Sequence, residues 1–301
     1  MAIQLRAPVP AGRPDGGPIS VRRAADADWQ ECGRICFEAF ASVAGRHGFP
    51  PDFPTVEAAA RPIRGLINHP AIYGVVAEQA GRIAGSSFLD ERSLISAIGP
   101  VSVDPVVQDG GVGRALVAAM LARASEQGAP GVRLVQIAYH NRSLSLYAKF
   151  GFDVRATLAA MHGTPLGGAL PGYAVRRAYP DDEGECNRLC LRIHGHDRPG
   201  ELREAIAAGT ARVVEHLGRI SGYTAGISYW SHSVAATNED LEALVCAAGE
   251  IPPPGILVPL DNAELFRWGL ARGLRIFFVT NLMSVGIYQQ PRGAWLPSVG
   301  Y

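Results

Sequence analysis

A glycine-rich stretch stands where a predicted strand passes into a predicted helix. The segment "VDPVVQDGGVGRALVAAM" covers residues 103–120, and in it Gln108, Gly111 and Gly113 follow a Q-x-x-G-x-G spacing. Glycine at such a point has two explanations. It supplies backbone angles that other residues avoid in a tight turn. It also lets the backbone approach an anionic ligand at a helix N-terminus, where free N–H groups and the helix dipole favour phosphate.

Other glycine-rich phosphate motifs do not fit this stretch. The P-loop pattern G-x-x-x-x-G-K-[ST] is absent from the sequence. A Rossmann G-x-G-x-x-G pattern starting at Gly111 would need a third glycine at the position of Leu116. That motif also belongs to the first strand–helix unit of its fold, whereas several predicted strands precede this stretch.

The elements that position the loop follow from the hydrophobic periodicity. Helices are expected at residues 27–42, 55–68, 111–127 and 143–151, and strands at residues 19–24, 72–79, 82–89, 95–103, 131–139 and 152–161. Some strands are joined as hairpins, whereas others flank helices. This mixture predicts an α/β (α+β) fold with a mixed sheet.

The chain also contains an internal repeat. "VRRAADADWQECGRIC" (21–36) and "VRRAYPDDEGECNRLC" (175–190) are identical at nine of sixteen positions, and "GRIAG" (81–85) returns as "GRISG" (218–222). The offset falls from 154 to 137 between the two matches, so the second copy is shorter by 17 residues there. The sequence therefore predicts a duplicated domain.

The repeat predicts the domain limits. We expect a flexible tail over residues 1–17, a first domain over 18–161, a Gly- and Pro-rich linker over 162–172 and a second domain over 173–301.

Composition narrows the classes of partner and compartment. The 301 residues contain 28 Lys or Arg and 28 Asp or Glu, so no net basic field points to nucleic acid or to a membrane surface. The first residues lack the apolar core of a signal peptide, and no apolar run approaches the ~20 residues of a membrane span. Five cysteines are an odd number, which fits a reducing compartment. We expect a cytoplasmic protein.

Four of these cysteines occur as C-x-x-x-C at the same place in each copy, namely Cys32 with Cys36 and Cys186 with Cys190. Cysteines four residues apart share a helix face, so together they could form a thiolate metal site. The usual two-residue ligand spacing is missing, and cysteine readily packs as a small hydrophobic residue. Core packing is favoured, and we expect no metal.

A second motif adds to the glycine stretch. Downstream of it, "SLSLYAKFGF" (143–152) follows a buried strand. The Q-x-x-G-x-G stretch resembles the acyl-CoA-binding motif of the GNAT N-acetyltransferase superfamily, and the downstream segment resembles that family's [AS]-x-x-LY-x-K-x-GF motif. The resemblance covers about residues 18–160 and extends weakly through the duplication to 173–301. It implies two tandem GNAT-like domains, each a mixed, mostly antiparallel twisted sheet flanked by helices.

The resemblance also implies an acetyl-CoA site, with backbone groups around the glycines holding the pyrophosphate and the preceding strand holding the pantetheine arm. The implied cofactor residues are Val101, Ser102, Val103, Gln108, Asp109, Gly110, Gly111, Val112, Gly113, Arg114, His140, Asn141, Ser143 and Tyr147. His140 stands where many family members carry a CoA-contacting Asn, and Asn141 follows it.

Tyr147 matches the family's tyrosine, which protonates or hydrogen-bonds the departing thiolate. The general base is left open among Asp90, Glu91 and His140. The 45–54 loop lies where the family usually builds its acceptor site, and its His47, Phe49 and Phe53 are the expected acceptor-binding residues.

The second copy lacks the glycine loop. In "VAATNEDLEALVCAAG" (234–249), Asn238, Glu239 and Asp240 stand where the first copy has glycines. Acidic residues suit a helix start but repel a pyrophosphate. The second domain is therefore expected to be degenerate, with cofactor bound only by the first.

The favoured interpretation is that the protein is an acetyl-CoA-dependent N-acetyltransferase. In this reaction a primary amine of a small molecule attacks the thioester directly. Two alternatives stay open, a non-catalytic acyl-CoA-binding sensor or scaffold and an acetyltransferase of protein amines. We expect a monomer or a homodimer.

Overall fold

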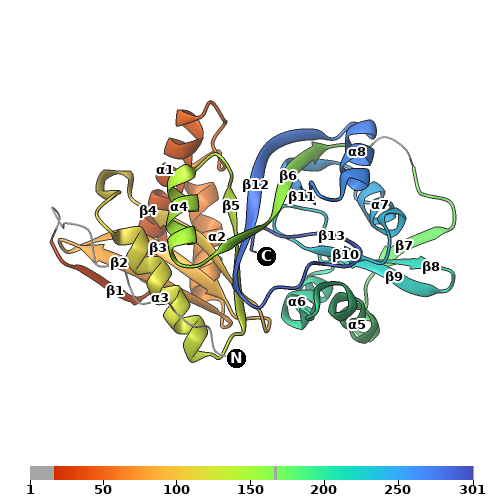
Figure 1. Ribbon diagram of the computed structural model, residues 1–301, viewed down its shortest axis with the longest axis horizontal. Coiled ribbons are helices and arrows are strands. Elements are labelled where there is room, and N and C mark those ends of the chain that lie inside the picture. The colour runs from red at the N-terminus through yellow and green to blue at the C-terminus, as the bar shows by residue number, and fades with distance from the viewer. Residues whose placement is uncertain (1–16, 166–167, 301) are drawn as a thin grey trace. The chain divides into compact units, whose positions relative to one another are not determined.

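A computed structural model describes residues 17–165 and 168–300, so the expected tail lies outside the described residues except for Gly17. The chain forms two compact units (Figure 1). Unit 1 comprises the residues up to Glu91 together with Ile95–Arg133 and Tyr139–Asp153. Unit 2 comprises Arg92–Leu94, Leu134–Ala138 and the chain from Val154 onward.

The two copies of the repeat contain the same helices and strands in the same order, except that the second, in its described residues, has no counterpart of the short helix η2. The elements of the first copy are β1 (Ile19–Arg23), η1 (Asp26–Asp28), α1 (Trp29–Arg46), α2 (Val56–Asn68), β2 (Ile72–Gln79), β3 (Arg82–Asp90), β4 (Ser96–Val103), η2 (Pro105–Val107), α3 (Val112–Glu126), β5 (Gly131–Ile137), α4 (Asn141–Lys149) and β6 (Asp153–Gly163). Those of the second are β7 (Tyr173–Arg177), η3 (Pro180–Asp182), α5 (Glu183–His194), α6 (Pro199–Ala208), β8 (Arg212–His216), β9 (Arg219–Thr224), β10 (Ser233–Ala235), α7 (Asn238–Cys246), β11 (Ile251–Pro259), α8 (Ala263–Ala271) and β12 (Arg275–Gly286), followed by β13 (Ala294–Leu296).

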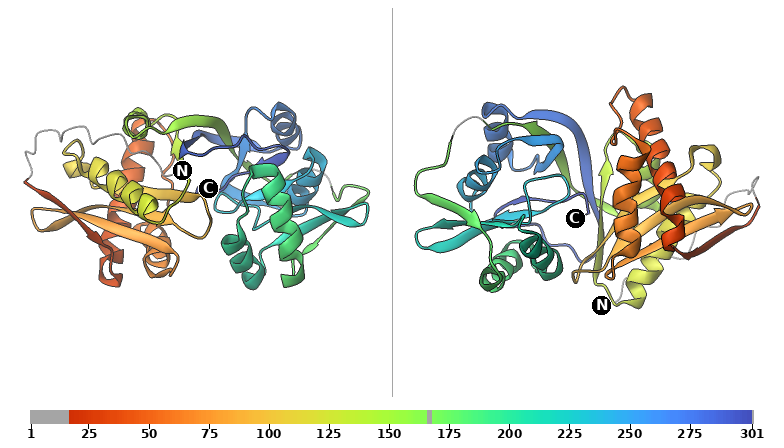
Figure 2. Two further views of the ribbon diagram at one scale, coloured as in Figure 1. Left: turned by 60° about the horizontal axis from the view of Figure 1, so that its bottom comes forward. Right: turned by 180° about the vertical axis from the view of Figure 1, so that it is seen from behind.

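In unit 1 the strand order is β1-β2-β3-β4-β5, antiparallel except for the parallel pair β4–β5. Helices α1 and α2 cover one face of this sheet, and α3 and α4 cover the other (Figures 1 and 2). Leu116, Met120 and Leu121 of α3 are fully buried because their helical spacing places them on its inner face. The predicted fold class, a mixed and mostly antiparallel sheet flanked by helices, is confirmed.

Unit 2 contains two sheets. One has the order β13-β10-β9-β8-β7, and in the other the end of β5 is followed by β12, β6 and β11. Strand β6, predicted as the last strand of the first copy, pairs antiparallel with β11, as in the register Met161 to Ile256. The domain limits 18–161 and 173–301 describe the repeat, and as limits of folding domains they stay a prediction.

The paired cysteines lie in the cores of their units, as the sequence predicted. Cys32 and Cys36 on α1 pack with Ile63 and Phe88, and Cys186 and Cys190 on α5 are equally buried. Burial raises the pKa of each thiol, that of Cys32 to about 12, so these thiols stay protonated at neutral pH. Among the described residues no group of three or more His, Cys, Asp or Glu side chains could hold a metal ion.

An ion-pair cluster is repeated in the two copies. In the first, Arg22 donates to both oxygens of Asp28 at 2.7 and 2.9 Å and to Glu78 at 2.8 Å. In the second, Arg176 donates to Asp182 at 2.7 and 2.9 Å and to Glu215 at 2.7 Å. The same three-residue geometry at the sequence offsets of 154 and 137 supports the duplication on structural grounds.

Replacing Asp28 with alanine is expected to destabilise the protein by about 1–3 kcal/mol, because the amide of Ala25 and the Arg22 guanidinium lose a largely buried acceptor. The hydrogen bond from Arg22 lowers the pKa of Asp28. This contribution is therefore present above pH about 4 and is lost as the pH falls toward the lowered pKa. Urea unfolding of the wild type and the variant, once near neutral pH and once well below pH about 4, measures this contribution to the free energy of unfolding. Exposed Asp26 supplies the matched Asp→Ala control, and equal loss in both variants would contradict the role of Asp28.

Candidate active site

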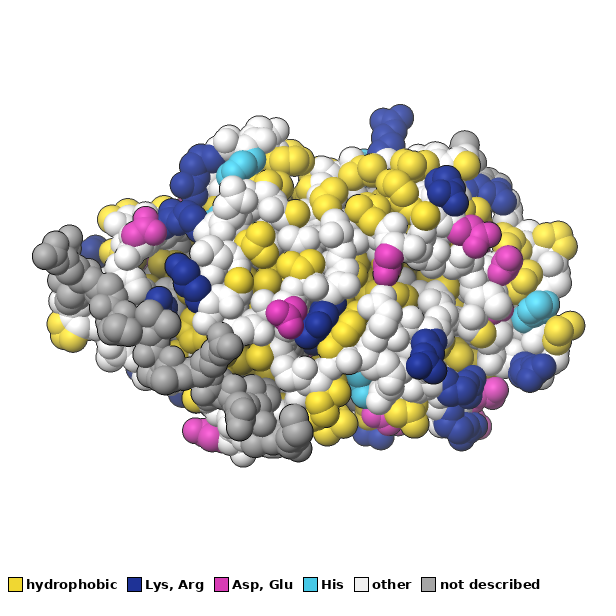
Figure 3. Space-filling model, in the orientation of Figure 1, with side chains coloured by type: hydrophobic (Ala, Val, Ile, Leu, Met, Phe, Trp, Pro, Cys, Tyr) yellow, Lys and Arg dark blue, Asp and Glu magenta, His cyan; other side chains and the backbone are white. Residues whose placement is uncertain are grey.

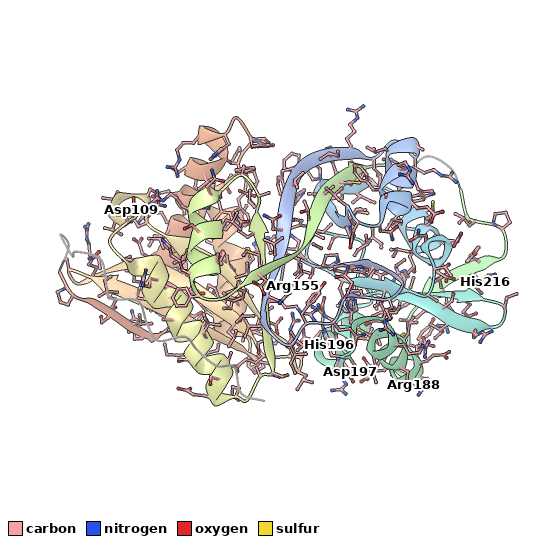
Figure 4. All side chains as sticks on the ribbon, viewed as in Figure 1. Asp109, Arg155, Arg188, His196, Asp197 and His216 are labelled. Carbon is pink, nitrogen blue, oxygen red and sulfur yellow. The ribbon has the colours of Figure 1, made fainter. Side chains whose placement is uncertain are left out.

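The loop between β4 and α3 is held by hydrogen bonds from its own side chains. Asp104 accepts from the amide of Val106 at 2.9 Å and starts the η2 turn. Gln108 donates to the carbonyl of Val103 at 3.2 Å, and its side-chain oxygen accepts from Arg142 at 3.2 Å. Arg142 also pairs with Asp109, which lies on this loop (Figure 4). The loop is thus tied to the end of β4 and to the start of α4.

The start of α3 lacks a side-chain cap. Asp109 has a φ of 72°, and Gly111, the N-cap residue, has a φ of 96°, both in the left-handed region. The first intrahelical bond runs from the amide of Ala115 to the carbonyl of Gly111 at 3.0 Å. The amides of the first turn precede this bond, as at every helix start. They are available to an anion because Gly111 has no side chain that could accept from them.

Gly113 lies in the first turn of α3 with little room around it. A Cβ there would lie 3.4 Å from Cδ2 of Leu146 and 3.6 Å from Cγ2 of Val103. These are ordinary contacts, so the fold alone does not require glycine at this position. A larger side chain would add bulk to the first turn of α3, next to Leu146 and Val103.

The residues of α4 fall into two groups. Arg142 and Ser143 stand in its first turn, where Ser143 donates to the carbonyl of the N-cap residue His140 at 3.0 Å. Tyr147, farther along, is 8% exposed and packs edge-on against Phe152 with ring centroids 6.0 Å apart. Burial raises the pKa of Tyr147 far above its ordinary value. Its hydroxyl therefore stays protonated at neutral pH and is able to donate a hydrogen bond.

Strand β4 pairs differently on its two edges. On the β3 side the ladder continues to its end, with Val101, Ser102 and Val103 opposite Ser87, Ser86 and Gly85. On the β5 side the ladder in the described chain is limited to Ser96 with Val132 and Ala97 with Arg133. The end of β4 thus keeps one edge for other partners, as the family resemblance implies for the pantetheine arm.

The expected base candidates have different surroundings. Both oxygens of Glu91 accept from Arg123, at 2.7 and 3.0 Å, so its lone pairs are engaged by a permanent cation. Burial lowers the pKa of His140 to about 4, with Arg142, Arg46 and His47 adding to the effect, so this imidazole is neutral but weakly basic. Asp90 ends β3 opposite Ala97. None of these positions by itself singles out a base.

The α1–α2 loop brings together two of the three predicted acceptor residues. Phe49 stacks on Tyr139 with ring centroids 4.6 Å apart and an interplanar angle of 7°, and His47 lies 4.8 Å from the same ring. Phe53 instead packs against Phe40 and the core of unit 1. Tyr139, two residues beyond β5, was not anticipated from the sequence, because its partners lie some 90 residues earlier.

Comparisons with known proteins agree with this geometry. Residues 70–154 match the family described as acetyltransferase (GNAT) domain. The matched segment of unit 1 is thus a GNAT acetyltransferase domain. A putative acetyltransferase from Pyrococcus horikoshii superposes with a TM-score of 0.68 at 16% identity, covering 92% of this chain and 94% of that one. A GCN5-related N-acetyltransferase from Sphaerobacter thermophilus gives a TM-score of 0.62 at 15% identity, covering 90% and 96%.

A tandem GNAT protein from the clavulanic acid biosynthesis pathway also superposes, with a TM-score of 0.53, 15% identity and coverage of 89% of this chain and 98% of that one. No curated protein matches significantly. The chain therefore has a tandem GNAT fold, with an acetyltransferase (GNAT) domain matched over residues 70–154. No helix in its described residues is both long and apolar enough to cross a bilayer.

In the second copy, side chains cap the start of the equivalent helix, α7. Thr237 accepts from the amide of Asp240 at 3.3 Å, and the carboxylate of Asp240 accepts from the amide of Thr237 at 3.1 Å. Asn238 is hydrogen-bonded to Asn262 and Glu264. This capping box satisfies amides that α3 leaves open, and it buries a carboxylate where a pyrophosphate would lie.

Proposed function

We propose that this protein binds acetyl-CoA in unit 1 and transfers the acetyl group to a primary amine of a small molecule. The observation that carries the proposal is the contrast between two equivalent helix starts. Helix α3 has a left-handed glycine cap and no side-chain acceptor, whereas α7 is closed by its Thr237–Asp240 capping box. Of these two helix starts, only that of α3 offers free amides to a pyrophosphate.

The residues around α3 suit a pyrophosphate in charge and in space. Arg114 stands in the first turn of α3 and Arg142 in the first turn of α4. Lys and Arg side chains gather over this part of unit 1 in Figure 3. Gly113 adds no side chain to the first turn of α3. The Arg142–Asp109 pair is exposed, so it can rearrange at little cost when a phosphate competes for the guanidinium.

Bound acetyl-CoA would supply the acetyl group as a thioester. The open edge of β4 can hold an amide-bearing arm by backbone hydrogen bonds, as an added strand is held at a sheet edge. Tyr147, kept protonated by burial, would donate a hydrogen bond to the sulfur as negative charge develops there. The ring group of Phe49, Tyr139 and His47 is compact and half-exposed, which suits a small amine better than an extended peptide.

Product analysis tests this function. Incubation with acetyl-CoA, a mixture of small primary amines and a set of lysine-containing peptides is expected to acetylate members of the first group, as seen by mass spectrometry, with release of one free thiol per product. Acetylation of peptides alone would replace the small-molecule acceptor by a protein amine. Binding of acetyl-CoA without any amine-dependent thiol release would show a sensor rather than an enzyme.

A further inference from the structure

One carboxylate of unit 1 differs from the other partly buried carboxylates in its surroundings. Asp28, Glu31, Glu91 and Asp104 each pair with an arginine side chain of the same unit. Asp52, in the loop between α1 and α2, is partly buried yet forms no ion pair with any side chain in the described parts of the chain. Apart from its own backbone N–H, no group of the described residues offsets the effect of burial on the pKa of this carboxyl. The fold therefore leaves a desolvated negative charge without a cation.

Asp52 belongs to the same α1–α2 loop as Phe49 of the ring group already described. Phe49 precedes it by three residues, and Asp52 acts electrostatically on the phenol of Tyr139 and on the thiol of Cys36. Phe49, Tyr139 and Asp52 are all of intermediate exposure, so a ligand can reach them. Aromatic rings beside a carboxylate form a favourable environment for an ammonium group, through ion pairing and cation–π attraction.

We propose that Asp52, together with Phe49 and Tyr139, binds the ammonium group of the acceptor and then takes a proton from it. The proposal rests on the proposed acetyl transfer. It also restricts the substrate class to primary amines without a carboxylate next to the amino group, because an acceptor carboxylate would be repelled by Asp52.

The acceptor nitrogen loses two protons during the transfer. The ammonium gives one proton to the carboxylate of Asp52 and becomes a neutral amine. Its nitrogen forms a bond to the acetyl carbon while the carbon–sulfur bond breaks. The second proton lost from nitrogen ends on the sulfur of the released CoA, and Asp52 returns its proton to solvent.

Burial raises the pKa of Asp52 to about 6. This value lies between the pKa of an ordinary carboxyl group and that of a general base that works at neutral pH. The groups around the loop are Cys36 and Arg46 on α1, His47 at its end, and Tyr139. The thiol and the phenol both stay protonated near neutral pH because their pKa values are raised to about 12. The carboxylate form of Asp52 is needed for binding, so kcat/KM for the amine should rise as the pH passes about 6.

The test compares two acceptors that differ in one carboxylate, 2-phenylethylamine and phenylalanine. The wild-type enzyme should prefer 2-phenylethylamine by at least about 100-fold in kcat/KM, equivalent to about 2.7 kcal/mol. Asp52→Asn should lose most of this preference and the step near pH 6, with acetyl-CoA affinity unchanged, and Asp52→Glu should restore part of both. Glu57→Gln, an exposed charge change on the adjacent helix α2, is the matched control.

An unchanged preference and pH profile in folded Asp52→Asn would overturn the proposal. Failure of the proposed function looks different, because the wild-type protein would then acetylate neither amine. In that case calorimetric titration with 2-phenylethylamine still decides the role of Asp52. Binding by wild type and Glu57→Gln but not by Asp52→Asn supports the ammonium site, whereas equal binding by all three, or none by wild type, contradicts it.

Discussion

Replacing Tyr147 with phenylalanine is expected to lower kcat by about 100- to 1,000-fold, because it removes one hydrogen-bond donor to the charge that develops on sulfur. The ring and its edge-on contact with Phe152 are retained, so acetyl-CoA affinity and melting temperature should stay close to wild type. Burial raises the pKa of this phenol well above that of a thiol, which favours hydrogen-bond donation over full proton transfer. Steady-state thiol release measures kcat.

Tyr229→Phe is the matched control for this substitution. Tyr229 is also 8% exposed and also packs edge-on against a phenylalanine, Phe278, with centroids 6.0 Å apart, but it lies in unit 2. Its kcat should equal that of wild type. An equal kcat for Tyr147→Phe would remove Tyr147 from the mechanism.

Replacing Gly113 with valine is expected to weaken acetyl-CoA binding by about 100-fold or more. The branched side chain would fill the space above the first-turn amides of α3 and prevent charge-assisted hydrogen bonds, each worth roughly 1.5–3 kcal/mol. The Cβ itself meets only ordinary contacts with Leu146 and Val103, so the variant should fold. Calorimetric titration gives the affinity, and a melting curve checks the fold.

Gly65→Val provides the control for the change from glycine to valine in a helix of unit 1. Gly65 lies on α2, and a Cβ there meets nothing within 4 Å. Its acetyl-CoA affinity should match that of wild type. Equal affinities of folded Gly113→Val and Gly65→Val would place the cofactor elsewhere.

Much of the fold could be predicted from the sequence because it depends on local patterns and on repetition. The duplication was visible in the two matched segments, and the equivalent ion-pair clusters of Arg22 and Arg176 bear it out. The glycine stretch was correctly predicted as a strand-to-helix turn, since Gly111 adopts a left-handed cap. The pairing of β6 with β11 could not be predicted, because hydrophobic alternation indicates a strand but not the edge that it joins.

The acceptor side of the candidate site was less accessible to sequence analysis. Glu91 was a candidate base from the sequence, whereas the structure pairs it with Arg123, 32 residues away. Asp52 gave no signal beyond its place in a Pro-rich loop, because its desolvation results from tertiary packing. Neither the stacking of Phe49 on Tyr139 nor the role of Asp52 follows from spacing along the chain. Such groups become visible only when distant segments are brought together.

The number of acetyl-CoA molecules bound per chain shows whether only one of the two duplicated helix starts, that of α3, holds the cofactor. Calorimetric titration of the full chain is predicted to give one acetyl-CoA per chain. This binding should be weakened by Gly113→Val and unaffected by Thr237→Ala, which opens the capping box of α7. Two molecules per chain, no binding, or binding that survives in folded Gly113→Val would contradict a single acetyl-CoA site at the start of α3.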